Sequence, residues 1–239
     1  MTSIGNDIVD LTSLESIGKS RDRRFIARVF TLEEQVRIDR SESPDTTLWM
    51  FWAAKEAAFK AVSKSRPGLS FIHRAYVVTF HPNESGKAAH VLLQQTNGDT
   101  VPIQERGVVM TPVGPVDAFF TLSSSHRVHC VAAAKNGHGG ASAATAVQVR
   151  EERRDGPFDP SAAVRRAAIH HLASVLKASP YYIDIRRDET PHGYGGPRVF
   201  IQGSRTDIDI SLSHDGRYIA FAVRLNWDPV VDDHRERRR

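Results

Sequence analysis

Three charged residues in one helix-forming stretch give the first indication of chemistry. In FWAAKEAAFKA, residues 51–61, Glu56 and Lys60 are four positions apart, so on a helix they lie together along one edge of an apolar stripe. Lys55 falls inside that stripe, where its ammonium group must either extend to water or meet a fixed anion. The alternative is an ordinary amphipathic helix whose exposed Glu–Lys pair stabilises it by about 0.2–0.5 kcal/mol.

A further candidate residue lies near the start of the sequence, in IGNDIVDL, residues 4–11. As a strand, this stretch places Asp7 and Asp10 on opposite faces, because side chains alternate along a strand. A metal ion bound there could take only one of the two carboxylates, and Asp7 has Val9 and Leu11 as apolar neighbours on its face. A turn or capping role is the alternative for either aspartate.

The composition limits the class of protein. The chain has 239 residues, of which 40% are hydrophobic, enough for one large or two small folded domains. Its net charge of +4 is concentrated in arginine clusters, which suit an anionic partner such as nucleic acid, phosphates or an acidic protein, or form a solvated face. Cys130 is the only cysteine, which excludes an intramolecular disulfide and a multi-cysteine zinc site. With no signal-peptide pattern and no apolar run near the roughly 20 residues of a membrane span, we expect a cytoplasmic protein.

Capping boxes and alternating patterns predict the order of the elements. Thr12 with Glu15, and Thr31 with Glu34, have the capping-box spacing, so a helix is expected to begin near each. The sequence DIDISLSHDGRYIAFAV, residues 207–223, predicts a hairpin with a turn at Asp215-Gly216. The other expected elements are strands at 75–80, 89–93, 101–103, 181–186 and 199–202, a hairpin of 119–125 with 128–134, a helix at 162–176 and a glycine-rich turn at 191–197.

The two parts of the chain share a pattern. LSSSH, residues 122–126, corresponds to ISLSH, residues 210–214, and the helix 52–60 corresponds to 162–170, which has Arg165 and Arg166 and lacks the carboxylate. We therefore predict a pseudo-duplicated α+β fold, in which each half has a helix packed on a mainly antiparallel sheet and a single active site lies in the cleft between them. The expected boundaries are a first half at 1–135, a linker at 136–156, a second half at 157–226 and a basic tail at 227–239.

Four motifs, GNDIVDL, FTLEE, FWAAKEAAFKA and SLSHDG, resemble those of the 4′-phosphopantetheinyl transferase superfamily. Its members move phosphopantetheine from coenzyme A to a serine of a carrier protein, and the resemblance covers residues 4–134 and 165–223. In the surfactin-type members the SxSH half comes first, whereas here the acidic half leads and begins like the small holo-acyl-carrier-protein synthases, which act as trimers. The resemblance thus implies a fused pair in swapped order, with one complete site in a monomer.

The resemblance implies roles for the residues of the acidic half. Asp7 and Glu56 would hold Mg²⁺ together with the coenzyme A pyrophosphate, and this fits the preference of Mg²⁺ for one or two carboxylates plus phosphate. Lys60 would contact the phosphates or protonate the leaving 3′,5′-ADP, and Lys55 would find its anion there. Glu56, or a water on the metal, would remove the proton from the carrier serine.

Further residues are implied for coenzyme A and for the carrier protein. Ser213 and His214 match the family's coenzyme A-binding pair, and the resemblance implies Arg165 and Arg166 as additional cations. Basic residues of the first half match the helix with which the small synthases bind acidic carrier proteins, namely Arg21, Arg24 and Arg28.

The sequence departs from the family pattern at three places. Val9 stands where surfactin-type members have a third metal ligand, which favours a metal site like that of the small synthases. Gly196 occupies the position of the lysine in the family's GKP motif, with Arg198 as a possible substitute. Ser125 and His126 of the first half are either a second coenzyme A contact or a relic of duplication, and we favour the relic.

The predicted function is Mg²⁺-dependent transfer of 4′-phosphopantetheine from coenzyme A to an apo acyl or peptidyl carrier protein. One alternative is a protein of the same fold that binds carrier proteins or coenzyme A without chemistry. The other is a basic nucleic-acid-binding protein, which the arginine-rich tail supports and the absence of a basic stretch interleaved with aromatic residues disfavours.

Overall fold

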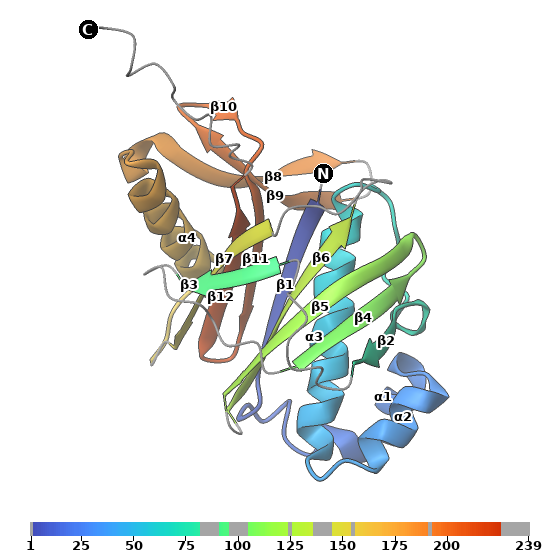
Figure 1. Ribbon diagram of the computed structural model, residues 1–239. Helices are drawn as coiled ribbons and strands as arrows, with labels where there is room; N and C mark the ends of the chain where they lie inside the picture. Colours follow the sequence, from blue (N-terminus) through green and yellow to red (C-terminus); the bar gives the residue numbers. More distant parts are fainter. Residues whose placement is uncertain are drawn as a thin grey trace, which may run out of the picture.

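The computed structural model describes residues 2–81, 91–95, 105–123, 126–135, 145–153, 156–190 and 193–225, in which two sheet-and-helix units lie side by side (Figure 1). The mixed α+β architecture with mainly antiparallel sheets confirms the predicted fold class. No helix within these ranges is long and apolar enough to cross a lipid bilayer.

The first unit is a five-stranded antiparallel sheet covered by the long helix α3 (Pro44–Ser63). The strands lie in the order β1 (Thr2–Asp10), β6 (Arg127–Lys135), β5 (Gly114–Ser123), β4 (Glu105–Thr111) and β2 (Val77–Phe80). Gly5 of β1 lies against the backbone of Ala57, where a Cβ atom would clash with the Ala57 carbonyl oxygen. The glycine therefore brings β1 and α3 into direct contact.

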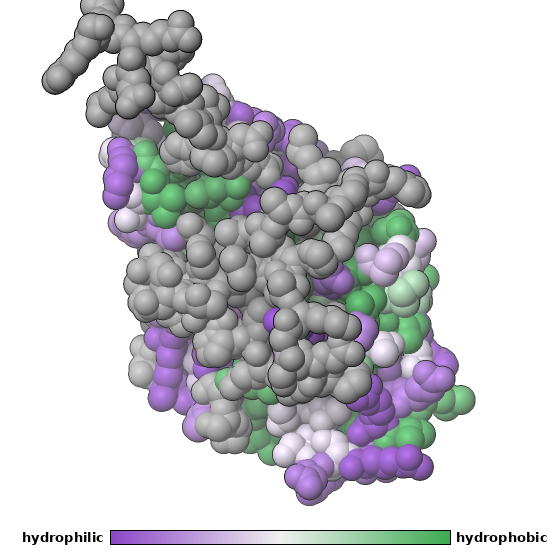
Figure 2. All heavy atoms as spheres, viewed as in Figure 1, coloured by the Kyte–Doolittle hydropathy of each residue, from purple (hydrophilic) through white to green (hydrophobic). Residues whose placement is uncertain are grey.

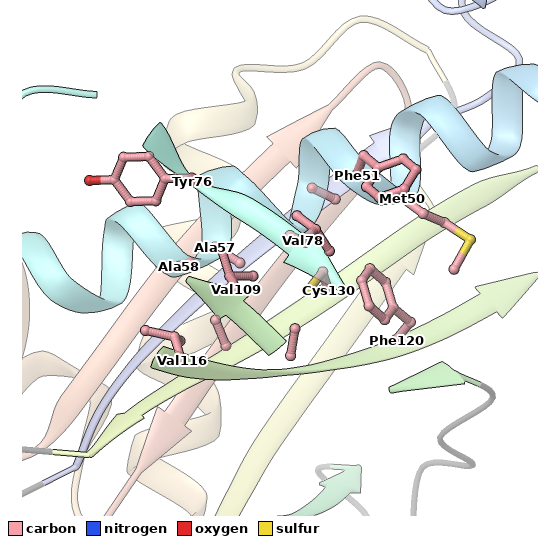
Figure 3. Packing of buried hydrophobic residues seen from close by; sticks show 14 of the residues in the cluster. Met50, Phe51, Ala57, Ala58, Tyr76, Val78, Val109, Val116, Phe120 and Cys130 are labelled. Carbon is pink, nitrogen blue, oxygen red and sulfur yellow. The ribbon is translucent and has the colours of Figure 1, made fainter. Parts of the chain in front are cut away.

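The core of the first unit lies between α3 and its sheet (Figure 3). Alanines on the sheet-facing side of α3, such as Ala57 and Ala58, are fully buried and allow close approach of the strands. Larger side chains fill the space toward β2 and β5, among them Phe51, Tyr76 and Phe120. This packing determines which face of α3 points toward the sheet. Glu56 and Lys60 lie on the edge of the helix outside this core.

Three short helical segments, η1 (Lys19–Arg21), α1 (Arg23–Val29) and α2 (Leu32–Asp39), precede α3, and η2 (His73–Ala75) follows it. The predicted capping box of α2 is confirmed, since the Glu34 N–H donates to Thr31 Oγ1 and Thr31 N–H donates to the Glu34 carboxylate. The helix expected from Thr12 and Glu15 is wrong. Residues 11–18 form turns, and the Thr12 N–H donates to Asp10 Oδ1, an aspartate two residues back, instead of starting a helix.

The second unit has two small sheets covered by α4 (Pro160–Leu176). One contains, in order, β11 (Asp209–Asp215), β12 (Tyr218–Arg224), β7 (Thr145–Arg153) and β3 (Val91–Gln95), the last parallel to β7. The other contains β10 (Ser204–Arg205), β9 (Gly193–Ile201) and β8 (Ile183–Thr190), which η3 (Pro180–Tyr182) precedes.

The two units share an order of elements that is consistent with duplication. In each, a first strand pairs antiparallel with the last strand, β1 with β6 and β7 with β12, and the covering helix follows the first strand. The hairpin of β5 with β6 in the first unit corresponds to β11 with β12 in the second. Both hairpins were predicted from the sequence.

Several predicted boundaries differ from the structure. The predicted linker 136–156 contains β7, and β3, predicted within the first half, pairs with β7 of the second unit. The glycine-rich turn expected at 191–197 is wrong, because β9 begins at Gly193, and β4 was not predicted. The expected strand 101–103, the basic tail 227–239 and Ser125 lie outside the described residues.

Candidate active site

Asp7, Glu56 and Lys60 come together where β1 crosses α3. The alternation of β1, which was predicted, places Asp7 on the face toward the helix, and Lys60 Nζ lies 2.8 Å from Asp7 Oδ1 and 3.2 Å from the carbonyl oxygen of Asn6. Glu56 precedes Lys60 by one helical turn. Burial, and then the negative charge of Asp7, raise the pKa of Glu56 to about 7, although Lys60 opposes the shift. These three residues thus form one electrostatically coupled group.

The donor set of this group fits a hard divalent cation. Within the described ranges, no cluster of three or more histidine, cysteine, aspartate or glutamate side chains is arranged for a metal, and the carboxylates of this group are those of Asp7 and Glu56. Mg²⁺ is commonly bound by one or two carboxylates, with waters and substrate phosphates as its other ligands. Two carboxylates whose repulsion raises a pKa are also a place where added positive charge is favourable.

Glu56 and Lys60 of this group line a cleft of about 600 Å³ between the two units, whereas Asp7 is not among its lining residues. One wall comes from the C-terminal part of α3 and the turn that follows it, and the other comes from β8, β9 and β11. Four cationic side chains and one carboxylate belong to the lining, namely Lys60, Lys64, Arg187, Arg198 and Glu56. A lining of this charge suits a polyanionic ligand.

The expectation that Lys55 contacts a ligand is wrong. Its side chain is fully buried, and Nζ binds the Glu34 carboxylate at 2.8 Å and the carbonyl oxygens of Tyr76 and His73 at 2.5 and 3.1 Å. All three protons of the ammonium group are thus used inside the first unit. The fixed anion that the apolar stripe demands is Glu34 of α2, and Lys55 links α3 to α2.

Ser213 and His214 lie on opposite faces of β11. Ser213 is 5% exposed and faces β1, where its hydroxyl donates to Asp7 Oδ1 at 3.0 Å. His214 is exposed on the other face. Burial, followed by the charge of Lys60, lowers the pKa of His214, while Asp215 opposes the shift. The pair expected to bind coenzyme A is therefore divided, and only His214 is accessible to a ligand.

The arginines expected to bind coenzyme A take three different positions. Arg198 of β9 lines the cleft opposite Lys60. Arg165 of α4 donates to Ser161 and shares a smaller pocket with Arg187, which also lines the main cleft. Arg166, the next residue of α4, is exposed. Arg198 thus lines the same cleft as Glu56, whereas Arg165 lines the smaller pocket that it shares with Arg187.

Lys64 and Arg187 were not among the predicted site residues. The Lys64 side chain is 6% exposed, and its Nζ binds Asp209 Oδ1 at 2.6 Å and the carbonyl oxygens of Ile4 and Ile210 at 2.6 and 2.7 Å. It continues the four-residue spacing of Glu56 and Lys60 along α3, a signal that could have identified it. The sequence around Arg187 gives no comparable signal.

Gly196, at the position of the family's GKP lysine, lies against Lys64. A Cβ atom on Gly196 would be 3.4 Å from Lys64 Cγ, at the limit of ordinary van der Waals contact. Position 196 is thus next to a lysine from the other unit.

Arg21, Arg24 and Arg28, predicted to bind a carrier protein, are all exposed on η1 and α1. Hydrophilic residues gather over this end of the molecule on the face shown in Figure 2, at the bottom of the view. Two large apolar residues near these helices are also exposed, Leu14 at 94% and Leu32 at 73%. We call the surface formed by these five residues the α1 surface.

The comparison with protein families concerns the first unit. Residues 3–110 match the model described as the 4′-phosphopantetheinyl transferase superfamily, and this range contains Asp7, Glu56 and Lys60. The match covers somewhat less than half of the 239-residue chain. Residues 111–239, including β11 with Ser213 and His214, lie outside the match.

Two further proteins are similar to the chain, one over a short stretch of sequence and one as a solved structure. A holo-[acyl-carrier-protein] synthase of Protochlamydia amoebophila (strain UWE25) is 39% identical over 59 residues, which are 25% of this chain and 48% of the relative. The chain thus spans about half the length of this curated relative. The solved structure of Thermotoga maritima holo-[acyl-carrier-protein] synthase aligns with 86% of each chain at 13% identity and a TM-score of 0.36.

Proposed function

We propose that the protein transfers the 4′-phosphopantetheine group from coenzyme A to a serine of an apo acyl or peptidyl carrier protein and releases 3′,5′-ADP. The observation that carries the proposal is the coupled group of Asp7, Glu56 and Lys60 beside a cation-lined cleft, in the part of the chain that matches the superfamily model. Coenzyme A is a polyanion, and its phosphates match the charge of the cleft.

In the proposed reaction, the serine oxygen of the carrier forms a bond to the phosphorus next to the pantetheine arm. The bond from that phosphorus to the oxygen of 3′,5′-ADP breaks, and this oxygen takes the electron pair. Mg²⁺, held by Asp7 and Glu56, would neutralise the charge that builds up on the pyrophosphate. The chain must therefore bind phosphates, position the serine and accept one proton.

Two residues of the group supply these roles. Glu56, or a water on the metal ion that Glu56 would hold, is the candidate acceptor of the serine proton. Lys60, which is 2.8 Å from Asp7, is the cation that would contact the pyrophosphate or give a proton to the leaving oxygen. On the other wall, Arg187 and Arg198 would bind further phosphate oxygens, with His214 and Arg165 nearby.

We propose that the two units act as a fused pair with one site between them. The first unit supplies the carboxylates, and the second supplies Arg187 and Arg198 across the cleft. The carrier would dock on the α1 surface, where cations and exposed leucines suit an acidic protein with apolar contacts. The corresponding helix position in the second unit has Arg166 instead of a glutamate, so a second metal site is not expected there.

The test is incubation of the purified protein with coenzyme A, Mg²⁺ and apo carrier proteins from fatty-acid, polyketide and peptide synthases. Intact-protein mass spectrometry should show the added phosphopantetheine on the carrier serine, and EDTA should prevent it. A folded protein that modifies no carrier of the panel would overturn the proposal. Binding of coenzyme A or carrier without transfer would favour the non-catalytic alternative.

A further inference from the structure

The edge of β1 that does not face β6 is covered by side chains of β11, and the two strands lie side by side (Figure 1). Backbone N–H groups at every second residue of β1 donate to side-chain oxygens at every second residue of β11. The four pairs are Ile4 with Asp209 at 2.7 Å, Asn6 with Ser211 at 2.9 Å, Ile8 with Ser213 at 3.1 Å and Asp10 with Asp215 at 2.8 Å. We call Asp209, Ser211, Ser213 and Asp215 the β11 ladder.

Ser213 differs from Ser211, the other serine of the β11 ladder, because it also contacts a residue of the candidate site. Its Oγ lies 3.0 Å from Asp7 Oδ1, and both side chains are buried, at 5% and 8% exposure. The hydroxyl already accepts the N–H of Ile8, so its own single proton is directed to the Asp7 carboxylate. The direction of this hydrogen bond therefore follows from the surroundings.

Asp7 is consequently held from two sides. Lys60 of α3 binds Oδ1 at 2.8 Å from the first unit, and Ser213 of β11 binds the same oxygen from the second unit. Hydrogen bonds to an ionised carboxylate are among the stronger ones in proteins, and a buried carboxylate fixed by two donors has little rotational freedom. The orientation of Asp7 thus depends on a residue more than two hundred positions away in the sequence.

We propose that Ser213 is a positioning residue, through which the second unit fixes the carboxylate that the first unit offers to the metal ion. Its hydroxyl faces Asp7, so Ser213 acts through Asp7 and not by contact with coenzyme A. The inference rests on the proposed function only for the use of Asp7 as a metal ligand. Loss of such a partner of a ligand typically weakens metal affinity about 10–100-fold.

The test is a Mn²⁺ titration of the full chain followed by electron paramagnetic resonance, in the absence of coenzyme A and carrier. We expect Ser213→Ala to weaken Mn²⁺ binding about ten-fold or more, and Ser213→Thr to restore most of it. Ser211→Ala is the matched control, because it removes the equivalent edge hydrogen bond to Asn6. It should lower the melting temperature, though less than Ser213→Ala, which also loses the hydrogen bond to Asp7, and leave Mn²⁺ affinity near that of wild type.

Three results would overturn the inference: wild-type affinity in Ser213→Ala, equal weakening by Ser211→Ala, or no Mn²⁺ binding by the wild type. If Ser213→Ala does not fold, Ser213→Cys takes its place with the same expectation, because a thiol fills similar space and is a weaker donor. The carrier transfer assay is run in parallel. If the wild type transfers the group and Ser213→Ala keeps full affinity for Mn²⁺, only the inference is refuted. If the wild type does not transfer the group but Ser213→Ala binds Mn²⁺ more weakly, only the proposed function is refuted.

Discussion

At the scale of single residues, Glu56 has the least ordinary electrostatic environment of the proposed site. Its carboxyl group is largely removed from water and lies near a second carboxylate, so its ionised form is disfavoured until a cation approaches. Lys60 compensates only in part, because its ammonium group is bound to Asp7. The residue is therefore suited both to hold a metal ion and to take up a proton near neutral pH.

Replacement of this carboxylate should remove activity without unfolding the protein. We expect Glu56→Gln to lower the transfer rate at least 100-fold, because the amide neither binds Mg²⁺ well nor accepts a proton. The measurement is carrier modification by mass spectrometry, with circular dichroism as the check on folding. Glu42→Gln, at an exposed position outside the cleft, is the matched control. Retained activity in Glu56→Gln would exclude Glu56 from the site.

The raised pKa of Glu56 also predicts a pH-dependent contribution to stability. In the folded protein the group stays protonated up to pH of about 7, whereas in the unfolded chain it ionises near pH 4.5, so its contribution is lost as pH rises between these values. The stability advantage of Glu56→Gln over wild type in EDTA should therefore increase across this window. We expect an increase on the order of 2 kcal/mol, allowing for partial exposure. Urea unfolding at pH 4.5 and 7 measures it, and a constant difference would contradict the shift.

At the scale of elements, the pair of Lys55 and Glu34 holds α2 against α3 and β2. Glu34 Oε1 accepts the Val78 N–H at 2.9 Å, while Oε2 accepts the Thr31 N–H and the ammonium group of Lys55. The same glutamate thus completes the cap of its own helix and binds two other elements. The position of the α1 surface relative to the cleft depends on this contact.

Removal of one partner should therefore be costly. Lys55→Met leaves Glu34 buried without its cation, and we expect a loss of about 3–5 kcal/mol in the free energy of unfolding. Arg23→Met, which breaks an exposed pair with Asp39, should cost less than about 1 kcal/mol. We expect the double variant Glu34→Gln/Lys55→Met to regain part of the free energy of unfolding that Lys55→Met loses, and to have transfer activity. A double variant that is stable but inactive would indicate that Lys55 has a direct role in the reaction.

The α1 surface predicts a separate effect on carrier binding. Arg24→Glu reverses a charge on this surface, so the KM for the carrier should rise about ten-fold or more at low ionic strength, with little change in kcat. The effect should shrink as salt is added. Arg205→Glu, an equal charge change at the exposed strand β10 of the other unit, serves as the control. Equal effects of the two substitutions would argue against the α1 surface as the docking site.

Local patterns predicted the elements better than their partners. The cap at Thr31 and Glu34 and the alternation of Asp7 in β1 depend on nearby residues, and both were predicted correctly. The anion for Lys55 is 21 positions away, and the contact of Ser213 with Asp7 spans 206 positions, so neither follows from spacing. The family resemblance pointed to Asp7, Glu56 and Lys60, which lie together in the structure, but it assigned Lys55 and Ser213 to a ligand because it carries no information on side-chain packing in this chain.

At the scale of the whole molecule, Lys64 forms an ionic link between the two units, as the pair of Arg217 with Asp10 also does. Its ammonium group binds one carbonyl oxygen of β1 and both a carboxylate and a carbonyl oxygen of β11. Burial lowers the pKa of Lys64, and the charge of Asp209 opposes this shift. The residue therefore lies at the end of the cleft where the walls are joined.

Loss of this link should uncouple the units. We expect Lys64→Met to lower the free energy of unfolding by about 3 kcal/mol or more, because Asp209 then remains buried without its cation. Calorimetry should show the single transition of the wild type broaden or split into two. Arg66→Met, two residues further along and exposed, is the control and should leave the transition unchanged. A sharp, unshifted transition in Lys64→Met would show that the other contacts suffice.

Because the edge of β1 is covered, association of the two units should not depend on the concentration of the protein. An open strand edge can pair with another chain. Here the β11 ladder occupies that edge from within the same polypeptide. Closure of the cleft is then an intramolecular event, governed by the effective concentration that the connecting segment provides and not by the amount of protein in solution.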